Sequence, residues 1–203
     1  MISAEDALRS TLGEPSDLVK SKVTDRLNDL TRQFVERSPF LCLATSAADG
    51  TCDVSPRGDP AGFVRILDER TLLLPDRPGN RLADSLRNVL GNPNVGLLFI
   101  VPGVTDTLRV NGRASIVDDP ELLEPCAVEG KAPKLALRIE IDQVFTHCSK
   151  AFLRARLWDP ESFVPRDELP SPGELLCSVG ADVDADTYDV ERAERYARRE
   201  GFY

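Results

Sequence analysis

The stretch that decides the fold is FLCLATSAADGTCDVSPRG, residues 40–58. It begins with a short apolar run, Phe40 to Thr45, which has the length of a single strand. The next residues end in Asp49-Gly50, and Asp-Gly is a dipeptide typical of a tight hairpin turn. A second strand is expected over Thr51–Ser55, so the two runs predict an antiparallel β-hairpin.

Strand signals continue along the chain. Residues 62–67 and 71–74 form a second pair, and 95–101 is a nearly continuous apolar run, as in a strand buried on both faces. Residues 107–117 contain Gly112, where we expect a bulge or bend, and 135–141 ends in apolar/polar alternation. Six to eight short strands with helices at their edges predict a mainly β fold. We expect a closed or half-closed β-barrel with peripheral helices rather than a βαβ sheet.

Helical periodicity appears on both sides of these strands. Residues 16–36 predict one helix with an apolar face, capped by Ser16 and ended before Pro39. Further helices are expected over 80–90, 149–158 and 190–203. The chain therefore divides into an N-terminal helical segment (1–38), a barrel domain (39–158) and a partly helical C-terminal extension (159–203).

Composition narrows the class of protein. The 203 residues carry a formal net charge of −9, which disfavours nucleic acid as a partner and also repels anionic lipid. No secretory signal or membrane-spanning run is visible, so we expect a cytoplasmic protein. Five widely spaced cysteines fit free thiols, and a single histidine makes a structural metal site improbable.

Two loops could bind an anion. The first, residues 55–62, follows a strand and places Arg57 between prolines and glycines, close to Ser55. The second runs from Pro75 through a Gly turn to Asn80 and Arg81, where a helix is expected to begin; helix N-termini favour phosphate. The alternatives are a surface turn with a solvated arginine and an ordinary capped helix.

A third candidate is His147-Cys148-Ser149-Lys150, directly after the alternating strand. Lys150 could lower the pKa of the Cys148 thiol and make it a nucleophile. No third group that would orient these side chains can be named, and lone cysteines usually act as small buried side chains. The sequence therefore assigns no catalytic residue.

The order and spacing of these pieces carry a family resemblance. The chain resembles the pyridoxamine 5′-phosphate oxidase-like family of FMN-binding split barrels, in its predicted flavin-nucleotide-binding branch. The segments that carry it span about residues 20–160 and are 40–45, 53–60, 62–64, 72–81, 92–93, 95–99, 108–114 and 147–151. Residues 184–203 do not match the C-terminal region of true pyridoxamine-phosphate oxidases, so flavin binding is implied more directly than the vitamin B6 reaction.

The resemblance implies a six-stranded split barrel that forms a homodimer with FMN at the subunit interface. It implies that Arg57, Asn80 and Arg81 hold the FMN phosphate, with Ser55 and Pro75 beside them and with Lys150 and His147 near the flavin. We expect an FMN-dependent oxidoreductase acting on a small molecule. The alternatives are a non-catalytic flavin carrier or redox sensor, a split barrel that uses F420 or haem, and a structural dimer with an empty groove.

Overall fold

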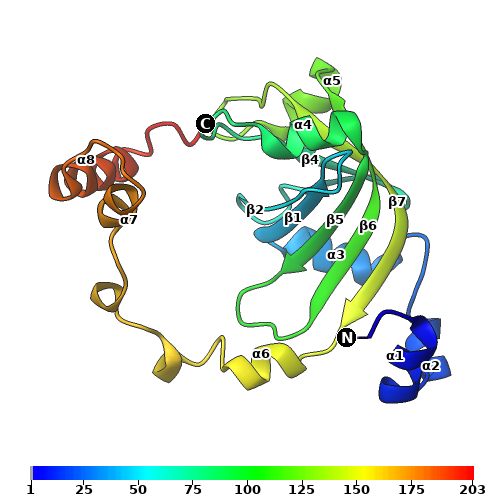
Figure 1. Ribbon diagram of the computed structural model, residues 1–203. Helices are drawn as coiled ribbons and strands as arrows, with labels where there is room; N and C mark the ends of the chain where they lie inside the picture. The colour runs from blue at the N-terminus through cyan, green and yellow to red at the C-terminus, as the bar shows by residue number, and fades with distance from the viewer. Residues whose placement is uncertain (1) are drawn as a thin grey trace.

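The computed structural model describes residues 2–203, and its centre is one seven-stranded antiparallel sheet (Figure 1). The strand order is β2-β1-β5-β6-β7-β4-β3. The strands are β1 (Phe40–Ser46), β2 (Cys52–Gly58), β3 (Arg65–Asp68), β4 (Thr71–Pro75), β5 (Asn94–Ile100), β6 (Thr107–Val117) and β7 (Ala136–His147).

The mainly β architecture with peripheral helices is as expected, but the sheet has seven strands and is not closed, whereas a six-stranded split barrel was expected. The seventh strand is β3, a four-residue edge strand that pairs only with β4. The edge strands β2 and β3 are not hydrogen-bonded to each other, so the sheet stays open. β5 is also buried on one face only, because its alternate residues lie on the outer face of this single sheet.

Local signals in the sequence placed the hairpin and the bulge correctly. β1 pairs with β2 from Phe40↔Gly58 to Ser46↔Cys52 across the Asp-Gly turn. The register of β6 against β7 shifts between Asn111 and Gly112, which confirms a bulge there. A Cβ atom at Gly112 would overlap the carbonyl oxygen of Glu140, so the close approach of the two strands requires glycine.

The core lies on the inner face of the curved sheet. Alternate side chains of β1, β4, β5, β6 and β7 point into it, including Leu43, Leu72 and Phe99, and all three are fully buried. Helices α3 (Asp29–Arg37) and α4 (Asp84–Gly91) contribute Val35 and Val89 to the same cluster. Packing against these two helices completes the core, which burial of apolar area stabilises.

The N-terminal region differs from the single helix expected over 16–36. It contains α1 (Glu5–Leu12), α2 (Asp17–Ser21) and α3, with Ser16 capping α2 as expected. Between α2 and α3, Thr24 forms a β-bridge with Val144. Asn28 then starts a new helix through a capping box with Thr31. Pairing with β7 and a strong cap therefore override the helical periodicity.

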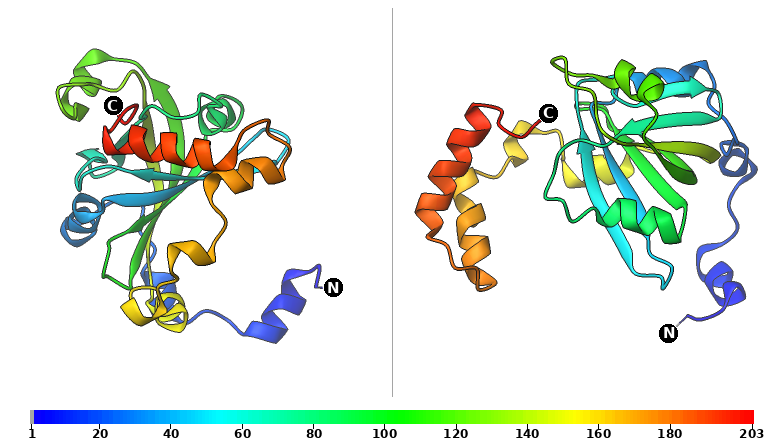
Figure 2. Two further views of the ribbon diagram at one scale, coloured as in Figure 1. Left: turned by 90° about the vertical axis from the view of Figure 1, so that its left-hand side faces the viewer. Right: turned by 90° about the horizontal axis from the view of Figure 1, so that it is seen from above.

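The segment after β7 forms an extended arm, residues 149–203, that leaves one end of the sheet and returns to the other (Figures 1 and 2). It contains α6 (Lys150–Ala155), α7 (Pro172–Ser178) and α8 (Ala185–Ala197), and a short helix α5 (Pro120–Leu123) precedes β7. α7 and α8 pack against each other, and the arm reaches the sheet again at Tyr203. Within residues 2–203, no helix combines the length and the apolar character needed to cross a bilayer.

Candidate functional site: a basic cavity at the end of β2 and β4

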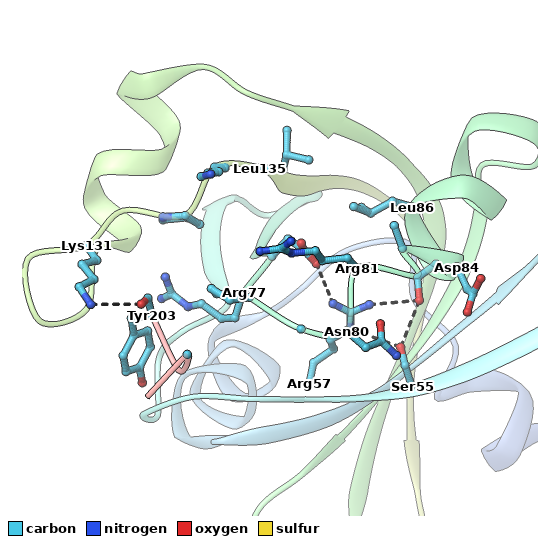
Figure 3. Close-up of a pocket in the computed structure, with 18 of the residues that line it drawn as sticks. Ser55, Arg57, Arg77, Asn80, Arg81, Asp84, Leu86, Lys131, Leu135 and Tyr203 are labelled. Atoms are coloured by element: carbon cyan, nitrogen blue, oxygen red, sulfur yellow. Dashed lines mark hydrogen bonds and ion pairs between the residues drawn. The ribbon is translucent and has the colours of Figure 1, made fainter. Parts of the chain in front are cut away.

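A cavity of about 1020 Å³ lies where the end of β2, the segment after β4 and the segment before β7 meet (Figure 3). Asp76 continues the β4–β7 ladder, because its N–H donates to the carbonyl of Leu135. This hydrogen bond holds the segment after β4 against the segment before β7. The charged side chains of the lining are Asp53, Arg57, Asp76, Arg77, Arg81, Asp84, Lys131 and Lys134.

Arg57 lies at the centre of a hydrogen-bond network on the cavity wall. Its guanidinium donates to Asp76 at 2.8 Å, to the Ser85 hydroxyl at 3.1 Å and to the Ser55 hydroxyl at 3.3 Å. Ser85 in turn donates to Asp53 at 3.0 Å. The side chain is about one-fifth exposed, so Arg57 is a positioned cation rather than a freely solvated one.

The segment between β4 and α4 forms the second wall, and it differs from the helix start expected at Asn80. Arg81 and Ala83 have left-handed backbone conformations, with φ of 65° and 56°, and α4 begins only at Asp84. The Asn80 carboxamide oxygen accepts from the N–H of Leu82, which makes a local turn instead of a helix cap. Asn80 and Arg81 still line the cavity, now from a loop.

Several cations of the cavity are not neutralised by carboxylates. Among residues 2–203, Arg81 and Lys134 have no carboxylate within 4.0 Å, and Lys131 donates only to the main-chain oxygen of Tyr203. The lining contains five cationic side chains and three carboxylates in a chain whose net charge is −9. The cavity is thus a local basic region that favours an anionic ligand.

The structure brings four of the seven expected site residues together: Ser55, Arg57, Asn80 and Arg81 all line the cavity. Pro75 is buried at the end of β4 directly before Asp76 and does not line it. His147 and Lys150 lie at the far end of β7. That strand is 12 residues long, so its ends are roughly 35 Å apart.

The surroundings of His147 are apolar and cationic rather than acidic. Its ring packs edge to face on Phe145, with centroids 5.0 Å apart. Burial lowers the pKa of His147 below its usual value, and the positive charge of Arg109 lowers it further. Cys148 beside it is exposed, and no hydrogen bond joins Cys148 to His147 or Lys150 in the described part of the chain. The geometry therefore gives no support to a nucleophilic thiol.

Sequence reasoning did not select several residues that line the cavity. Asp76 and Ser85 hold Arg57, while Lys131, Lys134 and Tyr203 come from segments far along the chain. Asp76 lies in the segment from Pro75 to Arg81 that the sequence analysis considered as an anion site. Its position one residue after an expected buried strand could have identified it as a residue of the site. The other four have no local signature, because only the tertiary fold brings them to the site.

Comparison with known proteins gave a family match and several similar solved structures. The family model described as "Pyridoxamine 5'-phosphate oxidase" matches residues 27–148. A search of curated proteins gave no match. Similar solved structures include HupZ of Group A Streptococcus, with 15% identity over 59% of this chain and 93% of that chain and a TM-score of 0.49.

Two further structures are similar over comparable lengths. A putative pyridoxamine 5′-phosphate oxidase from Lactobacillus delbrueckii has 22% identity over 60% of this chain and 95% of that chain, with a TM-score of 0.47. An FMN-binding protein from Syntrophomonas wolfei has 12% identity over 70% of this chain and 96% of that chain, with a TM-score of 0.44. The family match covers more than half of the chain and confirms the resemblance drawn from its motifs: this protein belongs to the pyridoxamine 5′-phosphate oxidase family.

Proposed function

We propose that this protein is a cytoplasmic, homodimeric flavoprotein that binds FMN in the basic cavity and acts as an oxidoreductase on a small molecule. The observation that carries the proposal is the arrangement around Arg57. Three of its five N–H donors are used by Asp76, Ser85 and Ser55, which leaves two for a phosphate. The guanidinium is already oriented, so binding a phosphate costs little side-chain entropy.

The rest of the lining also fits FMN. Arg81 offers a second guanidinium without a carboxylate partner among residues 2–203, and Asn80 has a free amide group beside it. The cavity volume of about 1020 Å³ is at the upper end of the range for small-molecule sites, so it has room for a ligand larger than its phosphate. Bound FMN would supply the electron-transfer chemistry, and the chain would supply binding and orientation.

A second copy of the chain would explain the expected roles of His147 and Lys150. Both lie at the opposite end of β7 from the cavity, too far to contact the same ligand within one subunit. A dimer that places this end of one subunit beside the cavity of its partner would bring them to the flavin.

The first test is the absorption spectrum of the freshly purified protein, with the released ligand identified by mass. Flavin bands and an FMN mass support the proposal. An intense Soret band or the mass of F420 contradicts it. The second candidate function is a flavin carrier or redox sensor without turnover. Rapid bleaching of the flavin by NADH or NADPH would favour an oxidoreductase over this candidate.

The phosphate assignment has its own test. Arg57→Gln and Arg81→Gln should each weaken FMN binding, because each removes charge-assisted hydrogen bonds worth about 1.5–3 kcal/mol, or roughly 10- to 150-fold in Kd. Arg138→Gln is the matched control, since Arg138 pairs with Glu140 at 2.9 Å on β7 and does not line the cavity. Equal affinities in all three variants would reject the assignment.

A further inference from the structure

The end of the arm builds part of the cavity, although it lies outside the region that matches the family. The family match ends at residue 148, whereas Gly201 and Tyr203 line the cavity. The arm touches the sheet where it leaves β7 and again at these last residues (Figure 2). This wall of the cavity is therefore a feature of this chain that family membership does not supply.

Tyr203 is held in place by a buried ion pair. Its hydroxyl donates to one carboxylate oxygen of Asp59 at 2.6 Å, and Arg77 donates to the other oxygen at 2.6 Å. The Asp59 side chain is only 1% exposed, and Arg77 also donates to the carbonyl of Cys126 at 2.7 Å. A buried carboxylate needs a cation and hydrogen-bond donors as partners. The Asp59–Arg77 pair therefore forms a specific binding position, or socket, for the tyrosine hydroxyl.

Further contacts fix the orientation of the ring. The main-chain oxygen of Tyr203 accepts from Lys131 at 3.2 Å, so the residue is held at its backbone and at its hydroxyl. The guanidinium carbons of Arg77 and Arg199 lie 5.3 Å and 5.7 Å from the ring centroid. The hydrogen bond to Asp59 raises the pKa of the Tyr203 hydroxyl, which keeps it protonated as a donor.

Because its hydroxyl is already used, Tyr203 offers the cavity an aromatic ring and not a hydrogen-bonding group. Figure 3 shows Tyr203 and Lys131 on the opposite side of the cavity from Ser55 and Asp84. A ligand whose phosphate binds Arg57 and whose chain crosses the cavity would present its other end to this ring. Planar aromatic groups pack favourably on such a ring.

We propose that Tyr203 is a ligand-contacting residue whose ring packs against the isoalloxazine ring system of bound FMN, and that Asp59 and Arg77 are its positioning residues. This inference rests on the proposed function and adds a residue from the arm to the same site. The arm then contributes directly to cofactor binding, as well as covering one side of the cavity.

Flavin fluorescence gives a direct readout. A tyrosine in contact with a flavin quenches its emission, because an electron passes from the phenol ring to the excited flavin and returns. Tyr203→Leu removes the ring, so bound FMN should show a longer fluorescence lifetime and roughly three- to tenfold weaker binding. Tyr203→Phe keeps the ring but is a poor electron donor, so it should lengthen the lifetime with a smaller loss of affinity.

The positioning residues need a separate variant. Asp59→Asn leaves the tyrosine in place but weakens the socket, so bound FMN should show a second, longer-lived component while the average affinity changes little. Tyr188→Phe is the matched control, because it removes a hydroxyl from a tyrosine of α8 that does not line the cavity. Its lifetime and affinity should equal those of the unmodified protein.

The outcomes separate this inference from the proposed function. If the unmodified protein binds FMN in an Arg57-dependent manner, and Tyr203→Leu and Tyr203→Phe leave lifetime and affinity unchanged, the inference about Tyr203 is wrong and the cofactor site stands. If the unmodified protein takes up no FMN, both are overturned. Longer lifetimes in both Tyr203 variants, with Tyr188→Phe unchanged, support the contact.

Discussion

Replacing Gly112 with alanine should destabilise the whole sheet. A Cβ atom there would overlap the carbonyl oxygen of Glu140 on β7, lie 3.0 Å from the carbon of that carbonyl and lie 3.3 Å from a methyl group of Ile139. The obstructing atoms belong to the backbone, so relief requires β6 and β7 to move apart at the bulge. Overpacking of this kind costs about 3 kcal/mol.

The measurement is urea denaturation followed by far-UV circular dichroism. A loss of about 3 kcal/mol should lower the urea midpoint by roughly 1 M for a domain of this size. Gly96→Ala is the matched control on the neighbouring strand β5. Its added Cβ would lie 3.4 Å from the Asn111 side-chain oxygen and 3.8 Å from the Cβ of Ala44, which are ordinary contacts.

The control variant should stay within about 1 kcal/mol of the unmodified protein, the range of strand propensities. A Gly112→Ala protein that unfolds at the same urea concentration as Gly96→Ala would refute the close approach of β6 and β7. If Gly112→Ala had a similar urea midpoint but a changed slope of unfolding free energy against urea concentration, the substitution would have altered the compactness of the native or denatured state. That result would also count against the reasoning.

Three further predictions concern the packing of the arm, the reactivity of the thiols and the protonation of His147. Gly173→Ala should loosen the arm without lowering the urea midpoint of the sheet, because a Cβ there would overlap the carbonyl oxygen of Ala185 in α8; faster proteolysis confined to the arm would confirm it. Burial raises the pKa of the Cys126 thiol, so iodoacetamide should modify exposed Cys148 well before Cys126, as mass spectrometry of timed samples can show. Burial lowers the pKa of His147 below 6.5, so stability should fall as the pH decreases through 6.5, and His147→Gln should reduce that loss in pH-dependent unfolding curves.

Sequence signals predicted the parts of the fold that short segments determine. The Asp49-Gly50 signal located the hairpin, and β1 and β2 pair across the loop that contains it. Gly112 likewise indicated a bulge, because glycine inside a strand often marks one. Both features depend on neighbours in the sequence and need no knowledge of distant contacts.

The N-terminal helix shows where such reasoning fails. The periodicity over residues 16–36 was real, yet the exposed fraction of Leu30 is 75% and that of Val23 is 43%. Thr24 forms a bridge with Val144 of β7, and the Leu27 N–H donates to the carbonyl of Glu69 in the turn between β3 and β4. Both partners are more than 40 residues away in the chain. These distant pairings cannot be read from a local pattern. The capping box of Asn28 and Thr31, by contrast, is a local signal for a new helix start.

The cavity depends both on local sequence signals and on tertiary contacts between distant residues. Arg57 and Arg81 could be found from the sequence, because both stand in stretches rich in glycine and proline next to an expected strand. Arg57 nevertheless lies within β2 itself and not in the loop expected over residues 55–62. Their surroundings could not be found that way. Tyr203 and Asp59 are 144 residues apart in the chain and 2.6 Å apart in space.

The net charge of the chain does not reveal the basic character of the cavity. A chain with a net charge of −9 would be expected to repel anions, yet its cavity gathers five cations against three carboxylates. The fold achieves this by bringing three separate segments, residues 57, 77–81 and 131–134, to one place. Low-dielectric walls strengthen the local field, while charges spread over the rest of the surface are screened beyond about 10 Å. Recognition of an anionic cofactor therefore depends on this local cluster, and the remaining acidic surface would mainly affect solubility and the rate of encounter.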